Sequence, residues 1–138
     1  MKKHDAWGNL FLRVLLGIIF AATGTGKLFM GNMPVEPIGG ILSSLGLNAI
    51  SAAGFGLFLG ILELMIGLML ILGLFTKIVG WVASITLLCF ILGVGVILGD
   101  GLFGQMMMFK DLGLLGGTLA LAFQGSKGMS LDEVLWKK

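Results

Sequence analysis

The sequence predicts an all-α membrane protein: a bundle of four transmembrane helices with a short interfacial helix between the first two. Three observations predict this class. Of the 138 residues, 57% are hydrophobic and 12% are charged, and the mean hydropathy is +1.08, whereas soluble domains carry about 25% charged residues. Apolar segments long enough to cross about 30 Å of hydrocarbon recur along the chain. The 24 glycines occur with only 2 prolines, which suits closely packed membrane helices.

Four spans are expected within a single integral membrane domain, residues 1–138. The spans cover residues 9–30, 49–75, 78–98 and 109–124. Asn48 is the candidate N-cap of the second span, because its side chain can accept a hydrogen bond from the first turn. Thr76 and Lys77 are expected to form a tight turn between the second and third spans.

The first span has an alternative interpretation as a cleaved signal peptide. A basic segment precedes the apolar residues, and Ala21 and Ala22 are small enough for a cleavage site. Arg13 interrupts the apolar segment, however, and three further spans follow. These features favour an uncleaved transmembrane helix.

Two short helices are expected outside the spans. In the loop after the first span, Pro37 is suited to the first turn of a helix and Gly46 to its end. This helix is too short to cross a bilayer and is expected to lie at the interface. In the tail, residues 125–138, Ser130 and Glu133 match a capping box for a last helix.

The distribution of lysines predicts the orientation. One side of the membrane receives most of them: Lys2, Lys3, Lys77, Lys127, Lys137 and Lys138. By the positive-inside rule, both termini are expected in the cytoplasm. The loops expected at residues 31–48 and 100–108 then face outward, with residues 99–101 closing the third span.

Five charged residues inside or beside the spans form a candidate ligand-binding ionic pocket. At about 1.5 Å of rise per residue, Arg13 and Glu63 are expected to pair deep in the bundle. Lys27, Lys110 and Asp111 are expected near the outer surface. Ionisable residues in membrane spans are commonly functional. A structural pair that only neutralises buried charge is the alternative.

Glycines at helical spacing predict where the helices pack. The candidate packing positions are Gly17, Gly24, Gly56, Gly60, Gly67, Gly113 and Gly117. Small residues four apart allow two backbones to approach closely. The first and second spans are therefore expected to pack along their glycine faces.

Other motifs indicate neither catalysis nor a metal site. The segment Gly24-Thr25-Gly26-Lys27 lacks the spacing of a phosphate-binding loop, and Leu28 stands where that motif needs Ser or Thr. One histidine, His4, and one cysteine, Cys89, provide neither a metal-ligand cluster nor a dithiol. A net charge of +2 does not indicate nucleic-acid binding. We expect no catalytic residues and no intrinsic cofactor.

Taken together, several short segments resemble the DoxX family of small four-helix membrane proteins. They are Arg13-xxx-Gly17-xx-Phe20, Gly24-xx-Lys27-Leu28-Phe29, Glu63-Leu64-Met65-Ile66-Gly67, Leu72-Gly73-Leu74-Phe75-Thr76, Lys110-Asp111-Leu112 and Ser130-Leu131-Asp132. The resemblance implies a membrane subunit associated with oxidoreductases, since relatives include a subunit of an archaeal thiosulfate:quinone oxidoreductase. It also implies the cytoplasmic membrane of a prokaryote as the location.

Two functional hypotheses follow. The first is an accessory or quinone-proximal component of a membrane oxidoreductase complex, which would contact quinone and the other subunits of that complex. The alternative is a small-molecule or lipid-binding transport protein, acting as a homo-oligomer around a buried ionic site. Both place the protein in the lipid bilayer.

Overall fold

The computed structural model describes residues 3–93 and 101–136. All the regular secondary structure in these residues is helical. The helices are α1 (Lys3–Phe29), α2 (Val35–Ser44), α3 (Ala52–Leu72), α4 (Thr76–Phe90), α5 (Gly101–Gln124) and α6 (Leu131–Trp136). Four apolar segments are long enough to cross a membrane; they lie in α1, α3 and α5, and in α4 together with its continuation to Gly93. The predicted fold class is confirmed, including the short helix after the first span.

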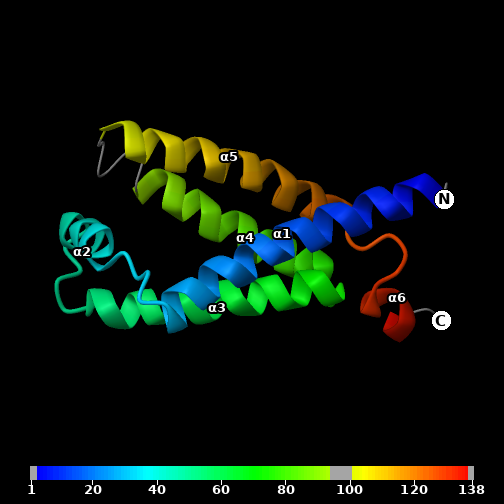
Figure 1. Cartoon of the computed structure of the whole chain (residues 1–138), viewed down its shortest axis with the longest axis horizontal. Coiled ribbons are helices and arrows are strands. Elements are labelled where there is room, and N and C mark those ends of the chain that lie inside the picture. The colour runs from blue at the N-terminus through cyan, green and yellow to red at the C-terminus, as the bar shows by residue number, and fades with distance from the viewer. Residues whose placement is uncertain (1–2, 94–100, 137–138) are drawn as a thin grey trace.

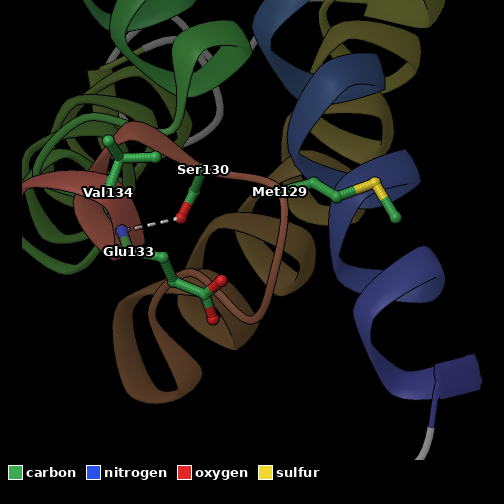
Figure 2. Close-up of a pocket in the computed structure, with 4 residues that line it drawn as sticks. All are labelled: Met129, Ser130, Glu133 and Val134. Carbon is green, nitrogen blue, oxygen red and sulfur yellow. Dashed lines mark hydrogen bonds between the residues drawn. The ribbon is translucent and has the colours of Figure 1, made fainter. Parts of the chain in front are cut away.

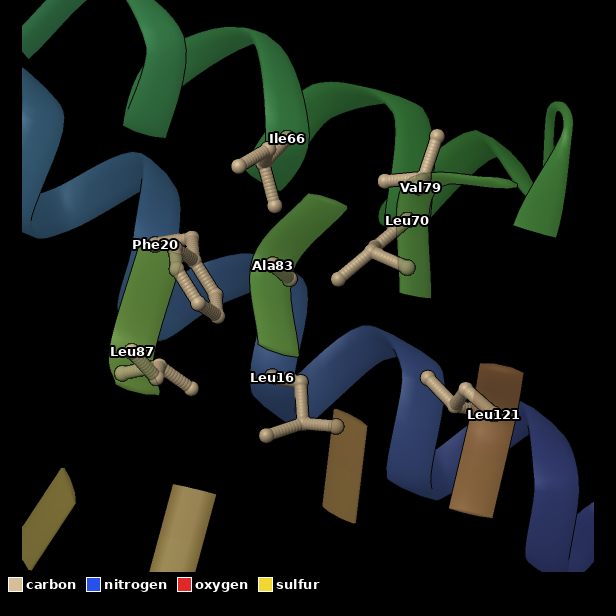
Figure 3. Close-up of a cluster of buried hydrophobic side chains, with 8 residues drawn as sticks. All are labelled: Leu16, Phe20, Ile66, Leu70, Val79, Ala83, Leu87 and Leu121. Atoms are coloured by element: carbon tan, nitrogen blue, oxygen red, sulfur yellow. The ribbon is translucent and has the colours of Figure 1, made fainter. Parts of the chain in front are cut away.

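The four long helices form two antiparallel pairs (Figure 1). α1 packs along α3, and α4 packs along α5. The beginning of α1 and helix α6 lie at the same end of the bundle, whereas α2 lies at the other end. We refer to these as the terminal end and the α2 end. All four long helices contribute to one buried apolar cluster (Figure 3): Leu16, Phe20, Ile66, Leu70, Val79, Ala83, Leu87 and Leu121.

The contact between α1 and α3 depends on glycines. A Cβ atom at Gly24 would lie 2.5 Å from the Leu64 nitrogen and 2.7 Å from the Gly60 oxygen. A Cβ atom at Gly67 would overlap the backbone of Ala21. Two helices approach this closely only when side chains are absent at the crossing.

Other predicted packing glycines have different neighbours. Gly56 faces Met33 and Ile38, so it packs against α2 and the loop before it. Gly117 faces Leu16 of α1. Among the described residues, no atom outside the local helix backbone lies within 4 Å of a Cβ position at Gly113, so no packing contact is seen there.

The α3–α4 turn is earlier than predicted. Gly73 ends α3 in the left-handed conformation with φ 69°, and the Leu74 amide donates to the Met69 carbonyl. This arrangement is a common helix stop that favours glycine. Thr76 and Lys77 are already inside α4, so the tight turn predicted there is wrong.

The start of α3 also differs from the prediction. α3 begins at Ala52, and its N-cap is Ser51, whose hydroxyl accepts a hydrogen bond from the Gly54 amide. The candidate cap Asn48 lies in the preceding turn.

α5 begins earlier than the fourth predicted span. Residues 101–108 are helical, so the outward loop predicted at 100–108 is wrong in its described residues, 101–108. The prediction broke the helix at a glycine-rich segment, but glycine only weakens a helix by about 1 kcal/mol. The end of the third predicted span, residues 94–98, lies outside the described residues.

α2 begins at Val35, and Pro37 lies in its first turn, where the missing amide is not needed. Ile38 and Leu42 are buried against Leu59 of α3. The helix therefore rests on the first turns of α3.

Candidate functional site

The charged residues of the predicted pocket lie in three separate places. The most buried ion pair joins the Lys27 ammonium of α1 to the Glu63 carboxylate of α3. The side chain of Lys27 is 14% exposed and that of Glu63 is 6% exposed. The ammonium also lies 5.7 Å from the ring centroid of Phe90 on α4, within the range of a cation–π attraction.

The predicted pairing of Arg13 with Glu63 is wrong. The prediction placed the ends of the first two spans at one level, but α3 extends past the end of α1 and its first turns pack against α2. This axial shift sets Gly24 against Gly60 and brings Glu63 within reach of Lys27. Arg13 instead lies beside Gly73, ten residues after Glu63 and therefore about 15 Å further along α3.

Arg13 is enclosed at the terminal end of the bundle. Its side chain is 1% exposed, and its Nη2 donates to the Met129 carbonyl at 2.7 Å. Its Nε and Nη1 have no partner among the described residues. A Cβ atom at Gly73 would lie 2.6 Å from Nη1, so the guanidinium occupies the space that a side chain at position 73 would need.

Asn9 holds the same C-terminal segment through a pair of hydrogen bonds. Its Nδ2 donates to the Gly125 carbonyl at 2.9 Å, and its Oδ1 accepts from the Lys127 amide at 3.1 Å. The sequence analysis missed this residue. The sequence does contain a signal that could have identified Asn9, because an asparagine at the start of an apolar span has a side-chain amide that needs hydrogen-bond partners when it is buried.

Asp132 fixes α6 to the beginning of α4. Its carboxylate accepts from the Phe75 amide at 2.6 Å, the Thr76 amide at 2.9 Å and the Ser126 hydroxyl at 3.1 Å. Burial by itself would raise the pKa of Asp132, but these hydrogen bonds outweigh it, and the pKa lies below its usual value. The carboxylate thus caps a helix whose own N-cap residue, Phe75, has no side-chain acceptor.

The predicted capping box is present in a modified form. Ser130 Oγ accepts from the Glu133 amide at 3.3 Å, but the Glu133 carboxylate accepts from the Gly128 amide instead of the Ser130 amide. A cavity of about 240 Å³ lies here; its lining residues are Met129, Ser130, Glu133 and Val134 (Figure 2). One of these lining residues, Met129, also accepts the hydrogen bond from Arg13.

The third charged place is the pair Lys110–Asp111 on α5, with 3.1 Å between Nζ and Oδ1. The Lys110 side chain is half exposed. Lys27 was expected to meet Asp111 near the outer surface, but its ammonium binds Glu63 instead. Among the described residues, no group of three or more His, Cys, Asp or Glu side chains could hold a metal ion.

Comparison with known proteins identifies the family. The family model for DoxX matches residues 8–96. The chain belongs to the DoxX family. The matched region of this DoxX protein includes Asn9, Arg13, Lys27, Glu63 and Gly73, whereas the C-terminal segment that Asn9 and Arg13 hold lies beyond it.

A curated relative extends the similarity to nearly the whole chain. It is named "Putative oxidoreductase CatD" and comes from Bacillus subtilis (strain 168). The two proteins are 30% identical over 140 residues, which cover 99% of this chain and 93% of the relative. No solved structure matches. The family and the four long apolar helices together indicate an integral membrane protein.

Proposed function

We propose that this DoxX protein is a quinone-proximal accessory subunit of a membrane oxidoreductase complex and has no redox cofactor of its own. Family membership and the name of the Bacillus relative support a role beside redox chemistry. The observation that carries the proposal is the Lys27–Glu63 ion pair beside Phe90, inside a bundle of apolar helices.

The depth of the pair makes a purely structural role costly. Glu63 lies eleven residues after Ala52, the first residue of the 21-residue helix α3, which is about 16 Å along the helix axis. The pair is therefore near the middle of an apolar span. Charged groups at this depth are unfavourable by a few kcal/mol, and in membrane proteins they commonly mark ligand or proton pathways.

The three side chains match the chemistry of a quinone head group. The Lys27 ammonium can donate a hydrogen bond to a quinone carbonyl, and the Glu63 carboxylate can accept a proton from a reduced quinone hydroxyl. The ring of Phe90 offers a face for stacking. Electrons would come from a cofactor of the partner subunit, so this chain would orient the head group and exchange protons.

Arg13 and the Lys110–Asp111 pair lie outside the proposed site. Arg13 is at the terminal end and binds the C-terminal segment. Lys110 is half exposed on α5, where its long side chain can reach the membrane surface. Lys110 is therefore a suitable position for a control variant.

A photoreactive quinone analogue tests the proposal in reconstituted vesicles. Lys27→Met is expected to reduce labelling of the protein about tenfold, the effect of losing ~1.4 kcal/mol of binding, whereas Lys110→Met should label like the wild type. Because Lys27→Met strands Glu63, the exchanged pair Lys27→Glu with Glu63→Lys is measured as well. Unchanged labelling in a folded double variant Lys27→Met/Glu63→Met would refute quinone binding at this site.

Purification in mild detergent followed by mass spectrometry tests the accessory role. Co-purification with an enzyme that carries a redox cofactor supports it. Recovery of a homo-oligomer with one bound lipid or small molecule, and no redox partner, would contradict it and favour the alternative of a binding or transport protein.

A further inference from the structure

The C-terminal segment presents a row of apolar side chains outside the four candidate spans. The exposed members are Met129, Leu131, Val134 and Leu135, and the last two are 76% and 62% exposed. The polar side chains of the same segment face the bundle, where Ser130 is buried and Asp132 binds α4. The segment is thus amphipathic, and its polar side chains already make hydrogen bonds within the chain.

Hydrogen bonds hold this segment at the level where the α4 span begins. Asp132 accepts from the amide of Thr76, the first residue of that span, and its own amide donates to the Gly73 carbonyl at 3.0 Å. Exposed apolar residues of α4 follow at once, with Ile78 at 63% and Trp81 at 44%. Exposed tryptophan at the end of a span is typical of the head-group layer of a bilayer.

A second cavity connects the segment with the surface of α4. It has a volume of about 340 Å³, and its lining residues are Phe75, Thr76, Lys77, Ile78, Ser126 and Asp132. Lys77 is exposed and brings a positive charge to the rim, while the exposed side chain of Ile78 extends the wall towards the apolar face of α4. One side of the cavity therefore carries the Lys77 ammonium and the hydrogen-bonded Asp132 carboxylate, and the other side is apolar, so the cavity is polar at one side and apolar at the other, as a phospholipid is.

We propose that the C-terminal segment is an interfacial lipid-binding surface. Met129, Leu131, Val134 and Leu135 insert into the boundary between head groups and acyl chains, and Lys77 binds the phosphate of a phospholipid in the adjoining cavity. Apolar side chains flanked by lysine, at the depth where a span begins, form the pattern of interfacial membrane segments.

The carboxylates of the segment are held by hydrogen bonds within the protein. Asp132 accepts three hydrogen bonds from α4 and the preceding loop, and Glu133 accepts one from the Gly128 amide. Asp132 also lines the cavity beside Lys77, and Glu133 lines the cavity beside Met129 and Val134, but neither carboxylate belongs to the apolar row. This leaves the segment free to contact lipid.

Fluorescence quenching tests the depth of the apolar row. Val134→Cys, in a Cys89→Ser background, carries an environment-sensitive dye in vesicles of phosphatidylcholine and phosphatidylglycerol. A second sample, the wild-type chain, carries the same dye on its native Cys89, which is exposed on the apolar helix α4 and serves as a lipid-facing reference. We expect lipids brominated near the carbonyl end of the acyl chain to quench the dye at position 134 several-fold more than aqueous iodide does. Strong quenching by iodide without quenching by brominated lipid would overturn the proposal and indicate a water-facing surface for a soluble partner.

Lipid retention tests the role of Lys77. Native mass spectrometry of the protein extracted from the same vesicles is expected to show a bound phospholipid that Lys77→Met loses and Lys110→Met retains. Inorganic phosphate added in excess should not displace it, because the acyl chains contribute to binding. Equal retention in both variants would refute the head-group site at Lys77, and displacement by free phosphate would refute lipid as its occupant.

Discussion

Removing one partner of the Lys27–Glu63 pair should destabilise the protein more than removing both. In Glu63→Gln, the Lys27 ammonium keeps its buried position but loses its counter-charge. Its side chain is only 14% exposed, so water cannot replace the carboxylate. Loss of one partner from a buried ion pair costs about 3–5 kcal/mol, whereas replacing both by apolar groups is often neutral. The double variant Lys27→Met/Glu63→Met is therefore expected within ~1 kcal/mol of the wild type.

The register between α1 and α3 supplies a matched control. Arg13 lies beside Gly73, about 15 Å along α3 from Glu63, so these two charges have no shared partner. A double-mutant cycle of Arg13→Gln with Glu63→Gln should be additive within about 0.5 kcal/mol. The cycle of Lys27 with Glu63 should instead show an interaction energy of about 3 kcal/mol or more.

The assay is reversible unfolding in mixed micelles of a mild detergent and sodium dodecyl sulfate, followed by far-ultraviolet circular dichroism. Each variant is also checked for helix content before unfolding. Additive effects of the Lys27 and Glu63 variants would refute direct pairing. A large interaction energy between Arg13 and Glu63 would refute the register of the two helices.

Three further predictions concern packing, pH and topology. Gly67→Ala should lower thermal stability, because its Cβ would overlap the backbone of α1, whereas Gly116→Ala should not, since no atom lies within 4 Å of that position; melting in detergent compares them. Because the folded state lowers the pKa of Asp132, its carboxylate stabilises the docking of α6 above about pH 4, and this contribution is lost as the pH falls through the folded-state pKa. Amide hydrogen exchange at the start of α4 should therefore become faster as the pH falls through this range. In Asp132→Asn, which lacks the titrating carboxylate, the same fall in pH should cause no such additional increase. Cysteines at positions Ser43 and Ser126 should react with an impermeant reagent from opposite sides of the membrane, and labelling of both from one side would contradict the four-span topology.

Local periodicity and composition were sufficient for the class of protein and for most helices. A segment of about 20 apolar residues has few structural alternatives to a membrane-spanning helix, since its backbone must be hydrogen-bonded internally in lipid. The short helix α2 and the capping residue Ser130 were equally accessible, because turn and cap preferences depend on neighbouring residues. The glycine contacts of α1 with α3 at Gly24 and Gly60 also follow the helical spacing of the sequence.

The partners of the charged residues depended on the tertiary structure. The sequence predicted Arg13 and Glu63 deep in the bundle and Lys27 near the outer surface, but which of these charges meet is set by the axial position of α1 against α3. That position results from the packing of α2 on the first turns of α3 and from the close contact of Gly24 with α3. Helical periodicity defines the face of a residue and leaves its level relative to another helix undefined.

The C-terminal segment shows the same limit over a longer range. Asn9 and Arg13 bind residues more than 110 positions away in the chain, and Asp132 caps a helix that begins 56 positions before it. Each of these side chains satisfies backbone groups that only the folded chain brings near. The sequence by itself determined which segments would form apolar helices. The tertiary structure decided which backbone and charged groups their polar side chains bind, because hydrogen bonds and ion pairs require contact within about 3–4 Å.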